Sequence, residues 1–123
     1  MRPPGTIYRG ELLFDGQLVK GESVTVDGEP LPLLPSLKLR NHSPTGFAWG
    51  YGGSGPAQLS LALLLDVTGD EGLALRAYQW FKWAVVIKWQ ERWEITAGDV
   101  VRWLRCWNRE GEEAEAVEKG GAL

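Results

Sequence analysis

The stretch RNHSPTGFAWGYGGSGPAQ, residues 40–58, holds the only histidine of the chain and five glycines, so it is the first place to look for chemistry. Glycine permits positive φ and a close approach of backbone to ligand. Unpaired amides at the start of a helix, with the helix dipole behind them, favour an anion. One hypothesis is therefore a site for a phosphate, nucleotide or carboxylate. Its candidate ligand-binding residues are Arg40, Asn41, His42, Ser43, Thr45, Trp49, Tyr51, Gly53 and Ser54.

A purely structural interpretation of the same loop stays open. GYGGSGPAQ lacks the Lys-Ser/Thr pair of a phosphate-binding Walker loop, and its spacing differs from the dinucleotide fingerprint. Glycine-rich turns also occur where a strand folds sharply onto a helix. Phe47, Trp49 and Tyr51 would then pack over the glycines.

Catalysis and metal binding have little support. His42 has no adjacent carboxylate to act with it as a general base, and we assign no catalytic residue. One histidine and one cysteine are too few for a structural zinc site, so no metal or cofactor is expected. Cys106 is expected to be a buried or half-buried small side chain. An enzyme that depends on His42 remains the third of three functional hypotheses.

The elements around the loop indicate an α+β fold. Residues 6–32 are expected to form strands, with turns at Asp15-Gly16 and Asp27-Gly28. Prolines 30, 32 and 35 exclude a central strand there, and alternation predicts that residues 37–40 rejoin the sheet. A short strand is also possible at residues 93–95. We predict a small N-terminal antiparallel sheet of three to four strands, followed by the glycine-rich loop and three helices packed on the sheet.

The first two helices differ in their apolar surfaces. The first is expected to start near Pro56 with Ser54 as its cap, to be buried on most sides, and to end at Gly69. The second covers about residues 70–88 and carries two apolar stripes, so one stripe needs an additional cover. We predict a protein partner or a homodimer there. The core stripe is Ala74, Tyr78, Phe81 and Val85, and the partner interface is Trp80, Trp83 and Ile87.

The third helix is expected to begin with a capping box at Thr96 and Asp99. Its apolar face repeats at helical spacing, and three arginines lie opposite. Five glutamates fall between Glu110 and Glu118, so we expect residues 1–110 to form a single domain and 111–123 an acidic flexible tail. The apolar face is Val100, Trp103, Leu104 and Trp107, and the arginines are Arg102, Arg105 and Arg109.

Composition excludes several classes of protein. The net charge of -3 argues against a general nucleic-acid coat, so a nucleic-acid partner is not expected. No apolar run approaches the roughly 20 residues of a membrane span. A lone cysteine fits a reducing compartment, which predicts the cytoplasm, that of the host if the protein is phage-encoded. Six of the seven tryptophans lie between Trp80 and Trp107, which indicates an aromatic core, a binding face, or both.

The segment LRNHSPTGFAWGYGGSGPAQLSLALL, followed by YQWFKWAVV, resembles a small family of uncharacterised bacterial and phage proteins. That domain of unknown function has the core pattern L-R-N-H-S-P-T-G-F-x-W-G-Y-G-G-S-G-P-A-Q-L, and the likeness covers most of residues 7–105. The chain departs from the pattern at Ala48, where an acidic residue is usual. The resemblance implies a phage or mobile-element setting and supplies no catalytic residues. We therefore expect a non-enzymatic binding or modulator protein acting on a host protein, with anionic-ligand binding as the alternative.

Overall fold

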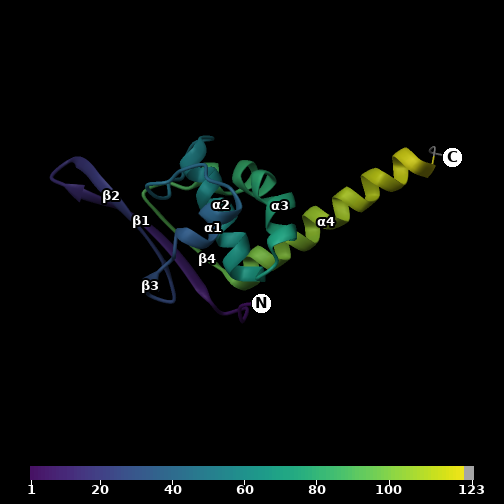
Figure 1. The fold of residues 1–123 in the computed structure, drawn as a ribbon, viewed down its shortest axis with the longest axis horizontal. Helices are drawn as coiled ribbons and strands as arrows, with labels where there is room; N and C mark the ends of the chain where they lie inside the picture. The colour runs from purple at the N-terminus through teal and green to yellow at the C-terminus, as the bar shows by residue number, and fades with distance from the viewer. Residues whose placement is uncertain (121–123) are drawn as a thin grey trace.

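Four antiparallel strands form one sheet in the order β3–β2–β1–β4, which confirms the predicted α+β class. The computed structural model describes the backbone of residues 1–120 and the side chains of residues 1–110. The strands are β1 (Ile7–Asp15), β2 (Leu18–Val26), β3 (Glu29–Pro30) and β4 (Arg92–Thr96). Both Asp-Gly pairs make the predicted turns, with positive φ at Gly16 and Gly28. The β1–β2 hairpin reaches beyond the helical part of the molecule (Figure 1).

The fourth strand in the sheet, β4, comes from late in the chain. It pairs with β1 from Ile7↔Thr96 to Glu11↔Arg92. The prediction that residues 37–40 rejoin the sheet is wrong. Those residues belong to the short helix α1 (Leu34–Leu39), which Arg40 ends in an extended conformation. Pro35 occupies the first turn of α1, where proline needs no donor, and the leucines at 37 and 39 are only partly buried. The predicted short strand at 93–95 is confirmed within β4.

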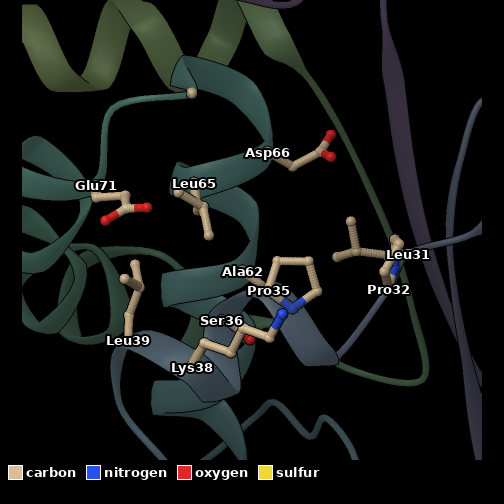
Figure 2. A pocket seen from close by; sticks show the side chains of 11 residues that line it. Leu31, Pro32, Pro35, Ser36, Lys38, Leu39, Ala62, Leu65, Asp66 and Glu71 are labelled. Atoms are coloured by element: carbon tan, nitrogen blue, oxygen red, sulfur yellow. The ribbon is translucent and has the colours of Figure 1, made fainter.

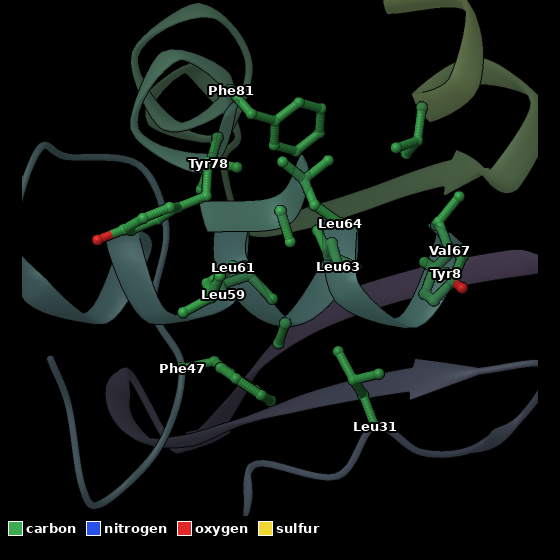
Figure 3. Packing of buried hydrophobic residues seen from close by; sticks show 14 of the residues in the cluster. Tyr8, Leu31, Phe47, Leu59, Leu61, Leu63, Leu64, Val67, Tyr78 and Phe81 are labelled. Carbon is green, nitrogen blue, oxygen red and sulfur yellow. The ribbon is translucent and has the colours of Figure 1, made fainter. Parts of the chain in front are cut away.

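Helix α2 (Ser54–Thr68) forms the centre of the molecule and is buried on most sides, as predicted. Its side chains meet the sheet on one side and the other long helices on the opposite side (Figure 3). Leu59, Leu61, Leu63 and Leu64 are completely buried. Gly69 ends the helix in the left-handed conformation, and its N–H donates to the carbonyl of Leu65 over 2.8 Å.

Helix α3 (Glu71–Ala84) returns alongside α2 and leads into the 3-10 turn η1 (Val86–Lys88). Asp70 caps α3 by accepting a hydrogen bond from the N–H of Leu73. Three members of the predicted core stripe, Ala74, Tyr78 and Phe81, are buried. The helix is shorter than predicted, since it stops at Ala84, and Ile87 therefore lies in η1.

Helix α4 (Ala97–Gly120) starts with the predicted capping box, in which Thr96 and Asp99 exchange two hydrogen bonds of 3.1 Å each. Val100 and Leu104 are buried on its apolar face. Cys106 is exposed, so the prediction of a buried side chain is wrong. The helical backbone continues to Gly120, past the predicted start of the tail at residue 111. The division at residue 110 stays a prediction, and residues 121–123 lie outside the described residues.

The N-terminal segment is tied to α2 through one carboxylate. The completely buried Tyr8 donates its hydroxyl proton to Asp66, and Arg2 forms an ion pair of 3.0 Å with the same side chain. Burial raises the pKa of the Tyr8 hydroxyl well above its ordinary value, with the Asp66 hydrogen bond adding to the effect. Among the described residues, no helix has both the length and the apolar character needed to cross a membrane.

Candidate functional site

The loop at residues 40–53 connects α1 to the start of α2, and its side chains divide into an exposed and an internal set. The structure leaves five of the nine predicted ligand-binding residues exposed, holds three half-buried and buries one. The exposed residues are Arg40, Asn41, Thr45, Tyr51 and Ser54, the half-buried ones are His42, Ser43 and Gly53, and the buried one is Trp49.

Gln58 anchors the first part of the loop from inside the protein. Its side chain is completely buried, and its Oε1 accepts hydrogen bonds from the N–H groups of His42 (2.8 Å) and Ser43 (3.1 Å). Its Nε2 donates to Oγ of Ser36 over 2.9 Å, and Ser36 in turn donates to the carbonyl of Leu33. The two amides of the loop are therefore used internally and are not offered to a ligand.

The imidazole of His42 lies against α3. Its Nε2 is 2.7 Å from the hydroxyl of Tyr78, and the two rings are tilted against one another at 5.5 Å. Burial lowers the pKa of His42, and the positive charges of Lys82 and Arg40 lower it further. Within residues 1–110, no carboxylate forms a hydrogen bond or ion pair with His42. The ring is therefore neutral near pH 7 and lacks the orienting acid of a general base.

Trp49 belongs to an internal aromatic cluster. Its Nε1 donates to the carbonyl of Gln90, and its ring meets Trp93 edge-on at 5.7 Å. Trp93 in turn stacks on Trp89 with the ring centroids 4.0 Å apart. The indole of Trp49 thus closes the end of the loop against β4, where it is only 7% exposed.

The start of α2 has few N–H groups without an acceptor. Pro56 has none, and the N–H of Ala57 is bonded within the first turn. Ser54 is the first helical residue and makes no capping hydrogen bond, so its predicted role as the cap is wrong; Gly53 occupies that position. The N–H of Ala57 donates to the carbonyl of Gly53 over 3.2 Å, and Pro56 has no N–H. The N–H groups of Ser54 and Gly55 have no acceptor among the described residues.

Lys82, which sequence reasoning missed, is the one buried cation among residues 1–110. Only 7% of the residue is exposed, and its Nζ lies 4.5 Å from the centroid of the Trp83 ring. It forms no ion pair and no hydrogen bond within the described part of the chain. The sequence could have indicated its position, since Lys82 lies four residues after Tyr78 and therefore on the same side of α3.

Three exposed aromatic side chains gather beside the loop. Tyr51, Trp80 and Trp83 are 55%, 64% and 56% exposed, and we call them the aromatic patch. Trp80 and Trp83 are neighbours on the surface of α3. The ring of Trp83 covers Gly52, where a Cβ would overlap it, and the ring of Tyr51 covers Gly53 in the same way. The glycines therefore let these aromatic rings lie directly on the loop backbone.

A pocket of about 450 Å³ lies elsewhere, between α1, α2 and the start of α3 (Figure 2). Its walls are largely apolar, with Leu31, Pro35 and Leu65 among them, and none of the predicted site residues lines it. Of its two carboxylates, Asp66 is already bonded to Arg2 and Tyr8, and Glu71 lies at the start of α3. The pocket therefore offers a ligand more apolar contact than polar recognition.

The described residues contain no group of three or more His, Cys, Asp or Glu side chains placed to hold a metal ion. The sheet, the loop and the helices together define a small α+β domain in which a glycine-rich loop enters a buried central helix. The chain belongs to a family of unknown function (DUF6166), whose model matches residues 8–106. This match confirms the resemblance to an uncharacterised domain family. No curated protein and no solved structure shows a match to the chain.

Proposed function

We propose that this protein is a non-enzymatic binding protein that presents the aromatic patch to a protein partner. The observation that carries the proposal is the exposure of Trp80 and Trp83, each more than half open to solvent on one face of α3. Tryptophan and tyrosine dominate the energetics of protein interfaces, and clustered exposed aromatic side chains mark interaction sites. The other tryptophans pack into the core or against it.

The loop supports this proposal in a structural way. Gln58 holds the backbone at residues 42 and 43, and His42 bonds to Tyr78 on α3. Gly52 then receives the ring of Trp83. These contacts fix the loop against α3, so that the aromatic patch is rigid before it meets a partner, which reduces the entropy lost on binding.

The partner is proposed to be either a second copy of the chain or a protein of the host cytoplasm, in keeping with the phage setting that the resemblance implies. Ile87 is half-buried within η1 and would contribute at the edge of such an interface. A His42-dependent enzyme has no comparable support, because no carboxylate within residues 1–110 forms a hydrogen bond or ion pair with the ring.

The test compares two variants, each of which replaces two exposed hydrophobic side chains with alanine. In one, Trp80 and Trp83 are both changed to alanine; in the control, Phe14 and Leu18, which are exposed on the β1–β2 hairpin, are both changed to alanine. Light scattering over a concentration series measures self-association, and affinity capture from host lysate measures a heterologous partner. The dimer or a stoichiometric partner should be retained by the wild type and the control and lost by the tryptophan variant. A monomer that captures nothing, or a complex that survives loss of both tryptophans, contradicts the proposal.

A further inference from the structure

We infer that a pocket between α3 and α4 binds a small amphiphilic carboxylate, that is, an aliphatic chain with one terminal carboxylate group. The apolar wall of the pocket would hold the chain, and Arg76 and Arg105 would hold the carboxylate. None of the three residues of the aromatic patch lines this pocket. Its test is therefore independent of the protein interface proposed above.

The pocket has a volume of about 360 Å³ and lies where the end of α2 meets the first half of α3 and the first half of α4. Leucine and valine side chains from both α3 and α4 form its apolar wall. Leu73 and Val101 are half-buried there, and Leu104 is buried. Pockets that bind small molecules are usually lined in this way, with a few polar groups that fix the orientation of the ligand.

The N-terminal segment supplies a further wall of the pocket. The N–H of Arg2 donates to the carbonyl of Val67 over 2.8 Å, and the N–H of Gly98 donates to the carbonyl of Pro4 over 2.9 Å. These bonds hold the segment against the end of α2 and the start of α4 (Figure 1). Met1 lines the pocket and is 80% exposed, so an aliphatic ligand would remove apolar surface of Met1 from water.

The charged side chains that line the pocket have one sign. They are Arg76 and Arg105, and no carboxylate of the described residues lines it. Neither guanidinium forms an ion pair or a hydrogen bond within residues 1–110. Nη1 of Arg76 and Oδ1 of Asp70 both lie beside Gly72, but no ion pair joins them, and Asp70 Oδ1 accepts the N–H of Leu73. Both arginines are therefore available to an anion in the pocket.

An apolar wall combined with two unpaired arginines favours an amphiphilic anion over other ligands. A carboxylate matches the planar guanidinium, which donates two parallel hydrogen bonds to it. The hydroxyl of Thr68 is already used, since it donates to the carbonyl of Leu64 and accepts the N–H of Asp70, and Asn108 also interacts within the chain. A purely apolar ligand would make no use of the two cations, and a small inorganic anion would leave the apolar wall in water. The pocket of about 450 Å³ is lined by charges of both signs and does not share this preference.

The experiment titrates the whole chain with octanoate and follows the amide resonances of Thr68, Leu73 and Val101 in heteronuclear NMR spectra. Butyrate has the same carboxylate on a shorter chain, and octylamine has the opposite charge on the same chain. Octanoate should saturate the shifts and bind at least about tenfold more tightly than butyrate, because each further buried methylene strengthens binding by up to about fourfold. Octylamine should not saturate them. The inference is overturned if octanoate gives no saturable shift up to about 10 mM, or if butyrate or octylamine binds equally well.

Variants of the two arginines test how the carboxylate is recognised. Arg76→Gln and Arg105→Gln each remove an exposed guanidinium without touching the core, so both proteins should fold. Each change should weaken octanoate binding several-fold, and the double variant roughly tenfold or more. Arg92→Gln is the matched control, because it removes the same charge from an exposed residue of β4 outside this pocket, and it should bind octanoate as the wild type does. Unchanged binding in the double variant, or equal weakening in the control, overturns the inference.

Discussion

The change Gln58→Leu should destabilise the protein by about 2 to 4 kcal/mol, because it leaves the loop without its internal acceptor. Leucine fills similar volume but leaves the N–H groups of His42 and Ser43 without Oε1, and Ser36 loses one donor. An unpaired buried donor costs roughly 1 to 3 kcal/mol. His42 and Ser43 are half-buried, so water partly replaces the lost acceptor and the sum stays near the lower half of the range.

Urea unfolding followed by tryptophan fluorescence measures the difference, and the melting temperature should fall by roughly 10 °C. Gln17→Leu, in the exposed hairpin turn, is the matched control and should change the stability by less than about 0.5 kcal/mol. If Gln58→Leu lies as close to the wild type as the control does, the Gln58 network does not hold the loop, and the rigid patch loses its explanation.

Two further outcomes depend on contacts away from the loop. Gly10→Ala should destabilise the sheet by about 1 to 3 kcal/mol in urea unfolding, because a Cβ at residue 10 would overlap the indole of Trp93; Gly21→Ala, whose Cβ meets open space, should not. Hydrogen bonds from Thr96 lower the pKa of Asp99, so the charged form is favoured in the folded state. The stability that Asp99 adds over Asp99→Asn should be full above the ordinary aspartate pKa of about 4 and shrink as the pH falls through the lowered value. Thermal unfolding at pH 7 and pH 3 should show this difference, smaller than about 1 kcal/mol because the side chain is exposed, and a pH-independent difference would refute it.

Local chemistry was sufficient to predict many of the element boundaries. The Asp-Gly turns, the end of α2 at Gly69 and the capping box of α4 depend on residues close together in the chain, so their signals survive without tertiary context. Helix α1 was missed because six residues are too few to show a helical period. Its leucines at 37 and 39 alternate as they would in a strand.

The sequence indicated which segment to examine, but not which of its side chains are already bonded to other parts of the chain. The glycine-rich loop indicated where to look, and the stripe of Trp80, Trp83 and Ile87 named the residues that the structure places at or near the surface. The loop residues His42 and Trp49 were predicted as ligand contacts, yet they also bond to α3 and to the segment before β4. A sequence gives donors and rings, but it does not say whether another segment of the chain already receives them.

By itself, the sequence determined the α+β class, the central buried helix and the family, because periodicity, turn residues and the long loop motif are all local properties of the chain. Only the tertiary structure decided which groups remain available. Gln58 uses two loop amides from inside α2, whereas the packing of α3 leaves Lys82 buried with no ion pair among residues 1–110. Hydrogen bonds and charges are satisfied through space, and the partners involved here are separated by many residues along the chain.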